Sequence, residues 1–184
     1  MFKLKPSKLT GCYELQPKVF DGARGRFVKI FHEQAFAVQG LETNFAEEYY
    51  SVSHKNVVRG LHFQLPLMNH VKMVYCVAGE VLDAVVDIRV GSPTYGQCAL
   101  FELSAEKANS IYIPKGMAPG FCSRTEQAIM VYKVSTIYSS AHDAGVLWNS
   151  VGIACPTCPT TEANLPTRDL SFPPPRQIFK SISL

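Results

Sequence analysis

The central part of the chain alternates between short apolar runs and polar turns. VKMVYCV (71–77) is followed by the turn Ala78-Gly79-Glu80 and then by VLDAVVDIRV (81–90). In the second run Leu82, Ala84, Val86 and Ile88 occupy alternate positions, which is the period of a half-buried strand. Further strands are expected at 97–103, 111–113 and 128–138, and one helix at 31–39. Short strands with turn signals every ~8–12 residues predict an all-β sandwich or barrel with few short helices.

The segment SVSHKNVVRGLHFQLP (51–66) reads as another strand that Pro66 closes. Arg59 and His62 interrupt its apolar character, and their positions have opposite strand parity. Both side chains can face one side only if the strand bulges, which Gly60 between them permits.

The pattern changes after Trp148. Six of the twelve prolines lie between Pro156 and Pro175, which excludes a central strand there. We expect an extended segment over the barrel or a neighbouring subunit, or else a partly disordered end. No repeat or linker divides the chain, so residues 1–184 are predicted to form a single domain with a proline-rich C-terminal segment from about residue 156.

Composition excludes several classes of protein. The 184 residues carry a net charge of +3, and no basic run interleaved with aromatics points to a nucleic-acid partner. An apolar signal region and an 18-residue apolar stretch are both missing, so we expect a cytoplasmic protein with no membrane association. The six cysteines mostly stand singly in apolar runs, which favours reduced thiols.

A group of polar side chains on neighbouring predicted strands suggests proton-transfer chemistry. The imidazole of His62 suits a general base near neutral pH, although most lone histidines are structural. A nearby Lys72 would stabilise an oxyanion formed next to a carbonyl. Tyr132 and Tyr138 share strand parity, and either hydroxyl could return a proton, although both could be core aromatics.

Other candidates would support that chemistry. Asp169 could orient the second nitrogen of the imidazole or be a surface aspartate. Arg24 and Arg59 are candidates for binding a diphosphate, with Arg176 as a more remote third. No metal is expected, because the five histidines form no HxH pair and Pro119 stands where a later ligand histidine would fall.

Several strings resemble the dTDP-4-dehydrorhamnose 3,5-epimerase family, from about Leu9 to Asp169. They are RGLHFQ (59–64), DIRVGSPTYG (87–96), DGARGRF (21–27), IPKG (113–116), YKVSTIY (132–138) and GVLWN (145–149). The resemblance implies a cupin-type jelly roll that works as a homodimer without metal or cofactor. It also implies a role in deoxysugar and surface polysaccharide biosynthesis, with inversion of stereocentres beside the C4 ketone of a nucleoside-diphosphate 4-keto-6-deoxysugar.

The resemblance also implies roles for single residues. His62 would be the general base, Asp169 its orienting carboxylate, Lys72 the group facing the C4 oxygen and Tyr132 the proton donor. The implied contacts with the diphosphate, nucleotide and sugar are Arg24, Arg59, Phe27 and Tyr138.

The chain departs from the family pattern where substrate would be held. Lys29 and Asp143 each replace a glutamate, Glu47 and Tyr49 replace a glutamine and an asparagine, and Pro119 replaces a pocket histidine. We therefore expect retained chemistry with altered recognition, in which the nucleotide is dTDP, CDP or GDP and C3, C5 or both are inverted. A 3,4-ketoisomerase and a non-catalytic sugar-nucleotide-binding protein are the alternatives.

Overall fold

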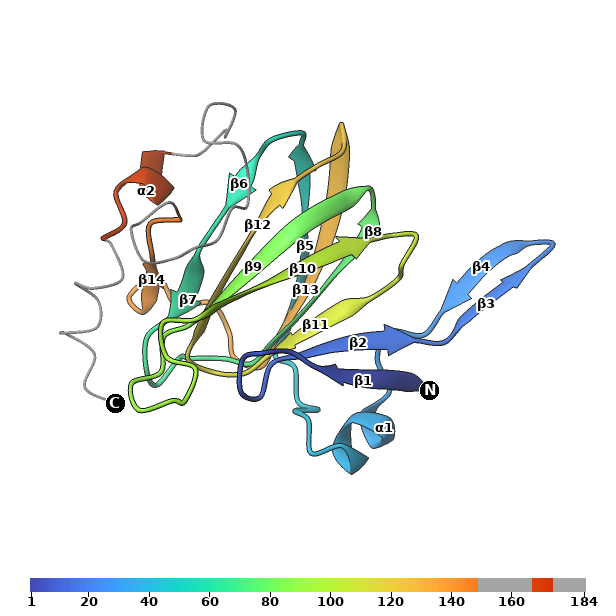
Figure 1. The fold of residues 1–184 in the computed structure, drawn as a ribbon, viewed down its shortest axis with the longest axis horizontal. Coiled ribbons are helices and arrows are strands. Elements are labelled where there is room, and N and C mark those ends of the chain that lie inside the picture. The colour runs from blue at the N-terminus through green and yellow to red at the C-terminus, as the bar shows by residue number, and fades with distance from the viewer. Residues whose placement is uncertain (149–166, 174–184) are drawn as a thin grey trace.

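The computed structural model describes residues 1–148 and 167–173. The predicted proline-rich segment and Arg176 therefore lie outside the described residues, except for Thr167–Pro173. Within the described ranges strands are the main secondary structure, which confirms the predicted all-β jelly roll (Figure 1). The described residues form two short helices, α1 (Glu33–Val38) and α2 (Thr167–Leu170), and α1 falls in the expected position.

Two antiparallel sheets face each other across the core. The larger has the order β1-β2-β11-β8-β13-β5. Its strands are β1 (Phe2–Pro6), β2 (Tyr13–Pro17), β11 (Ser110–Ile113), β8 (Lys72–Ala78), β13 (Gln127–Val134) and β5 (Glu47–His54). The smaller has the order β10-β9-β12-β6, formed by β10 (Cys98–Ser104), β9 (Glu80–Asp87), β12 (Met117–Ser123) and β6 (Val58–Arg59).

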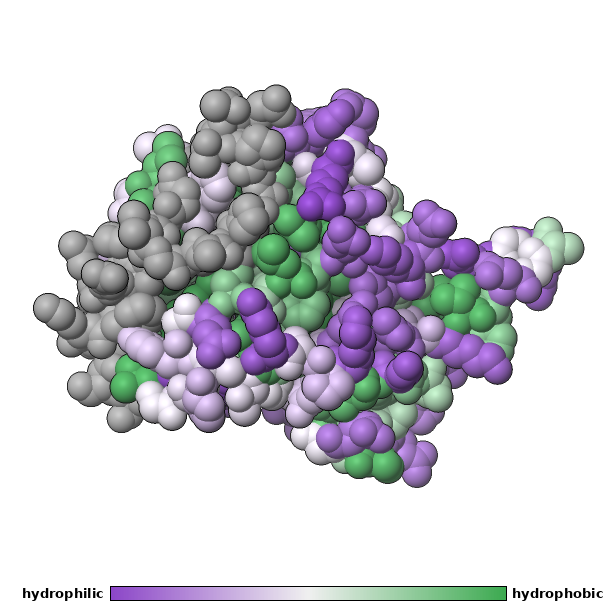
Figure 2. Space-filling view, viewed as in Figure 1, coloured by the Kyte–Doolittle hydropathy of each residue, from purple (hydrophilic) through white to green (hydrophobic). Residues whose placement is uncertain are grey.

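Two small two-stranded sheets complete the described strands. β7 (His62–Gln64) pairs with β14 (Asp143–Gly145), and β3 (Val19–Gly22) pairs with β4 (Gly25–Val28). The β3–β4 hairpin extends away from the two sheets (Figure 1). Its Phe20 and Phe27 are 49% and 60% exposed. The space-filling view shows hydrophobic residues among the hydrophilic ones on this side of the molecule (Figure 2).

The half-buried interpretation of residues 81–88 is wrong. Seven of the eight residues of β9 are buried, because the strand lies between β10 and β12 and both of its faces are covered. Val81 and Val85 pack in the core between the sheets, whereas Ala84 and Val86 pack with Phe63 of β7 on the other face. The alternation therefore separates two buried faces rather than a core face from a solvent face.

β12 was not expected, because Pro119 and Gly120 stand at its centre. Pro119 pairs in register with Val85 of β9, while β6 pairs only with Phe121 and Cys122 of this strand. A proline is tolerated at position 119 because β6 makes no backbone hydrogen bonds with β12 at this residue. The missing backbone N–H of the proline therefore costs little.

The cysteines follow the expectation only in part. Cys12, Cys76 and Cys122 are buried, as expected for small apolar residues. Cys98 is disulfide-bonded, so the expectation of a reduced thiol is wrong at that position.

Candidate functional site

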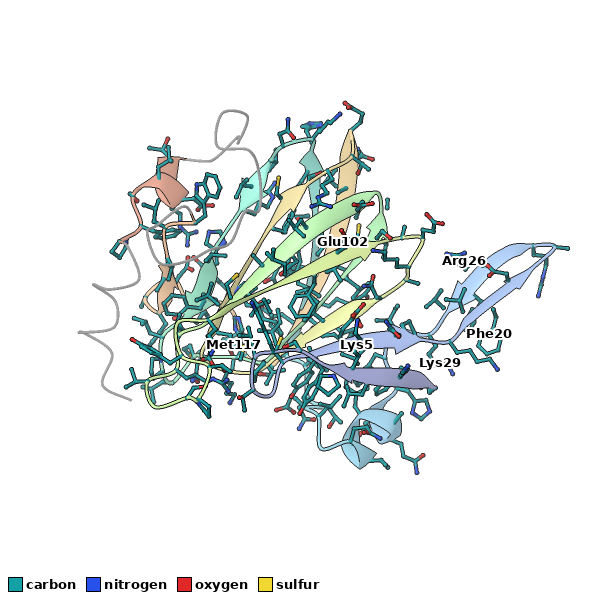
Figure 3. The ribbon with its side chains drawn as sticks, in the orientation of Figure 1. Lys5, Phe20, Arg26, Lys29, Glu102 and Met117 are labelled. Atoms are coloured by element: carbon teal, nitrogen blue, oxygen red, sulfur yellow. The ribbon has the colours of Figure 1, made fainter. Side chains whose placement is uncertain are left out.

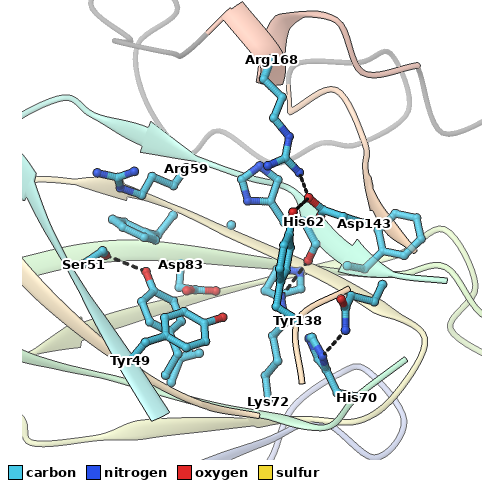
Figure 4. A pocket seen from close by; sticks show the side chains of 17 residues that line it. Tyr49, Ser51, Arg59, His62, His70, Lys72, Asp83, Tyr138, Asp143 and Arg168 are labelled. Atoms are coloured by element: carbon cyan, nitrogen blue, oxygen red, sulfur yellow. Dashed lines mark hydrogen bonds and ion pairs between the residues drawn. The ribbon is translucent and has the colours of Figure 1, made fainter. Parts of the chain in front are cut away.

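A cavity of about 280 Å³ opens between the two sheets, and residues of both sheets and of the β7–β14 pair line it. Its wall mixes aromatic and ionisable side chains (Figure 4). The predicted site residues in this wall are Tyr49, Arg59, His62, Lys72, Pro119, Tyr132, Tyr138 and Asp143. Arg168 lines it as well, which brings the C-terminal helix α2 to its edge.

The backbone at Gly60 brings Arg59 and His62 to the same cavity. The expected single strand is divided into β6 and β7, and Gly60 between them has φ of +136°, a conformation that other residues rarely adopt. A Cβ at this position would lie 2.4 Å from Cα of Gly120 in the neighbouring strand. Only glycine fits both the conformation and the close approach.

His62 and Asp169 form a hydrogen-bonded pair, with 2.9 Å between Nε2 and Oδ1. Asp169 is 1% exposed, and its Oδ2 also accepts a hydrogen bond from the Gly60 backbone N–H. Burial favours a higher pKa for Asp169, but the hydrogen bond and charge of His62 together with the Gly60 N–H outweigh it and lower the pKa. An ionised Asp169 that accepts Nε2–H leaves Nδ1 as the basic nitrogen of the ring.

The helix that carries Asp169 is held by contacts on either side of it. Arg168 forms an ion pair with Asp143 of β14. Phe172 packs edge-on against His62 with 5.6 Å between ring centroids, and Gly145 leaves it room, because a Cβ there would lie 2.3 Å from the Phe172 ring. These contacts place a carboxylate behind the imidazole.

Lys72 lies at the first position of β8 and donates a hydrogen bond of 3.0 Å to the backbone carbonyl of His62. Burial lowers the pKa of Lys72 to about 8, against the opposing charges of Asp83 and Asp143. The ammonium is therefore largely protonated at neutral pH and lies next to the proposed base.

Tyr132 lies on β13, in the sheet opposite to Asp83. Its hydroxyl is 2.9 Å from Oγ of Ser51, and its ring stacks on Tyr49 with 4.9 Å between centroids. Figure 4 places Ser51 and Tyr49 across the cavity from His62. Burial raises the pKa of Tyr132, so the hydroxyl keeps its proton at neutral pH and can act as an acid.

Hydrogen bonds hold the remaining predicted residues at the cavity. The hydroxyl of Tyr138 donates to Oδ2 of Asp143 over 3.1 Å, and the Tyr138 backbone N–H donates to Oε1 of Glu47 over 3.1 Å. Arg59 donates from Nε to Oγ of Ser53 over 3.0 Å. Glu47 and Asp143 are thus occupied in holding Tyr138, and Glu47 is not in the cavity wall.

Arg24, Phe27 and Lys29 are not brought to the cavity within one chain. All three are exposed and belong to the β3–β4 hairpin or the residues that follow it. In Figure 3 Lys29 lies on the hairpin side of the molecule, with Phe20 and Arg26.

Three ionisable residues of the cavity wall, Asp83, His70 and Arg168, were missed in the sequence. Asp83 belongs to the fully buried strand β9, and an acidic residue within a continuous apolar run is the signal that could have revealed it. His70 lies two residues before Lys72, and its Nδ1 contacts Gln64 and Thr136. Burial and the charges of Lys72 and Lys115 lower the pKa of His70 to about 3, so the ring is neutral.

The assembled groups are those required to move a proton on carbon. A base supported by a carboxylate, a neutral hydroxyl across the cavity and a cation in the same cavity wall can remove and return a proton beside a carbonyl. Within residues 1–148 and 167–173 no three His, Cys, Asp or Glu side chains are grouped as metal ligands would be. In the same ranges no helix has the length and apolarity needed to span a bilayer.

Comparisons with known proteins agree on one family. A family model described as dTDP-4-dehydrorhamnose 3,5-epimerase matches residues 6–176. An enzyme of that name from Shigella flexneri is 42% identical over 139 residues, covering 75% of this chain and 77% of the relative. One similar structure is that of NovW, a 4-keto-6-deoxy sugar epimerase from the novobiocin biosynthetic gene cluster of Streptomyces spheroides. It superimposes with a TM-score of 0.94 at 32% identity, and the match covers 98% of this chain and 91% of the NovW chain. ChmJ, a 3'-monoepimerase from Streptomyces bikiniensis solved with dTDP-quinovose, gives 0.88 at 30%, covering 96% and 90%.

Proposed function

The chain belongs to the dTDP-4-dehydrorhamnose 3,5-epimerase family, and we propose that it inverts carbon centres beside the C4 ketone of a dTDP-linked 4-keto-6-deoxyhexose. The observation that carries this proposal is the hydrogen-bonded pair of His62 and Asp169 facing Tyr132 across one cavity, with Lys72 in the same cavity wall. Inversion requires removal of a proton on one face of the carbon and its return on the other, which needs two groups placed in this way.

In the proposed reaction His62 takes the proton from the carbon next to the ketone through Nδ1. The electron pair of the broken C–H bond moves into an enolate, whose oxygen lies next to the ammonium of Lys72. Asp169 stabilises the imidazolium that forms. Tyr132 then gives its proton to the opposite face of the carbon, and solvent restores both groups.

The number of centres inverted is a separate question, because relatives of both kinds are known. Enzymes named as 3,5-epimerases and as a 3-epimerase both resemble the chain. We propose that His62 serves whichever centre the sugar presents to it, so the pocket wall and not the base decides between C3 and C5.

We also propose a homodimer in which the β3–β4 hairpin of one protomer completes the nucleotide site of its partner. The hairpin projects from its own chain and exposes Phe20 and Phe27, and Arg24 at its tip is exposed too. Exposed aromatic rings beside a guanidinium suit a nucleobase and a diphosphate. This arrangement accounts for predicted contacts that lie far from the cavity of their own chain.

Epimerisation is tested by incubating the enzyme with dTDP-, CDP- and GDP-linked 4-keto-6-deoxyglucose in heavy water. We expect deuterium at C3, C5 or both in the dTDP sugar, read by NMR. The absence of exchange with all three substrates would refute the proposed reaction, and a carbonyl moved to C3 would show a ketoisomerase instead.

The shared site is tested by mixing two inactive variants. One carries the single substitution His62→Asn, and the other carries both Arg24→Ala and Phe27→Ala. If the hairpin acts in the partner's site, hybrid dimers contain one intact site, and about a quarter of all sites recover. No recovery, despite subunit exchange shown by mass spectrometry, would contradict the shared site without affecting the proposed reaction.

A further inference from the structure

Asp83 is an ionisable group in the cavity wall that the proposed reaction does not use. It belongs to β9, between Val81 and Val85, which pack in the core, and it is 2% exposed. Its partners in register are Phe101 on β10 and Phe121 on β12. The neighbouring strands therefore surround this carboxyl with apolar side chains, and Figure 4 shows it at the cavity.

The carboxyl of Asp83 lacks the donors that a buried carboxylate needs. Among the described residues its Oδ1 has no hydrogen-bond partner. Asp87, four residues along the same strand, provides the contrast, because it accepts hydrogen bonds from Arg89, Ser92 and Thr94. Removing an ionised carboxylate from water without such donors is costly, and the usual outcome is that the group takes up a proton.

The charged and titratable groups nearest to Asp83 leave that outcome in place. Lys72 on β8 attracts a negative charge at Asp83, but its ammonium donates to the His62 carbonyl. Tyr132 on β13 stays neutral, because burial raises its pKa. Burial raises the pKa of Asp83 well above its usual value and outweighs the attraction of Lys72.

We propose that Asp83 is protonated in the working enzyme and that its O–H, together with Lys72, donates a hydrogen bond to the C4 oxygen of the bound ketosugar. This role rests on the proposed function. A neutral acid adds a donor without cancelling the positive charge of Lys72, whereas an ionised Asp83 would repel the enolate. The enolate oxygen then has two donors, one charged and one neutral, in a site shielded from water.

The protonation state is tested without turnover by infrared difference spectroscopy between the wild type and Asp83→Asn at pH 7. We expect the variant to lose a band of a protonated carboxyl group. Loss of a carboxylate band instead would overturn the proposal. The hydrogen bonds of Asp87 lower its pKa to about 2, so it is a carboxylate in both proteins. Its band therefore cancels in the difference spectrum.

The hydrogen bond is tested by the kinetics of two variants of similar size. Asp83→Asn keeps a neutral donor, so we expect kcat within about tenfold of the wild type, whereas Asp83→Leu removes the donor and should lower kcat by roughly 100-fold or more. Affinity for dTDP alone should not change in either variant, which also verifies that the fold is intact. Equal losses in the two variants would overturn the donor role, as would a Leu variant with full kcat. If the wild type exchanges no deuterium, the donor role falls with the proposed function, while the infrared result still decides the protonation state.

Discussion

Replacement of Asp169 by asparagine tests the central pair of the site. Asp169 accepts a hydrogen bond from His62 over 2.9 Å and is almost fully buried, so the variant removes a charge-assisted hydrogen bond whose acceptor is shielded from water. Such a bond contributes about 1.5–3 kcal/mol, which corresponds to a 10- to 150-fold lower kcat.

A second effect adds to this loss. An asparagine that turns its NH₂ toward Nε2 makes that nitrogen an acceptor and puts the proton on Nδ1, the nitrogen that must take the substrate proton. In serine proteases the equivalent change lowers kcat by about 10⁴ through the wrong tautomer. We therefore expect Asp169→Asn to lower kcat between about 10² and 10⁴, with little change in KM.

The assay is the rate of deuterium incorporation beside the ketone, followed by NMR under saturating substrate. Glu102→Gln is a matched acid-to-amide control, because Glu102 lies on the outer strand β10 and pairs with Lys107 and Arg124 away from the cavity. A kcat for Asp169→Asn within about threefold of the wild type would refute the assigned role.

Three further outcomes follow from the structure. The rate should fall as pH rises through about 8, because Lys72 is charged below its pKa of about 8 and neutral above it. Lys72→Arg should extend activity to higher pH, since the guanidinium stays charged. A pH–rate profile whose upper limb is the same in the variant would contradict the role of Lys72. Tyr132→Phe should lower the rate of inversion by roughly 100-fold or more, while His62 still exchanges the substrate proton with solvent. If the rates of exchange and of inversion fall to the same extent, the acid and base roles are not separate. Gly60→Ala should lower the free energy of unfolding by roughly 3 kcal/mol in urea titrations, because its Cβ meets backbone at 2.4 Å. Gly22→Ala, which has open space for a Cβ, is the control.

The sequence predicted much of the fold because most strands are bounded by turn residues. Gly79, with φ of +75°, separates β8 from β9 as expected. The prediction failed where two rules conflict, as in β12, whose proline and glycine are typical of a loop. It failed as well at Asp83, because periodicity shows that a strand has two distinct faces but not that both are covered.

The sequence also predicted part of the candidate site. The motif around Arg59 and His62 could be identified because a charged pair in an apolar strand is unusual, and the resemblance suggested Asp169 and Tyr132. Sequence alone could not show that Glu47 and Asp143 are bonded to Tyr138, because those contacts depend on how distant segments meet. In the proposed homodimer the hairpin residues act on a second copy of the chain, a relation that the pattern of one sequence does not display.

The separation of His62 from Asp169 along the chain has a consequence for biosynthesis of the enzyme. The two residues are 107 positions apart, and the carboxylate comes from a four-residue helix near the C-terminal end of the described residues. A ribosome releases the strands of both sheets before it releases this helix. The sheets can therefore assemble while the proposed base still lacks its carboxylate, and a nascent chain gains the complete pair only after helix α2 has emerged.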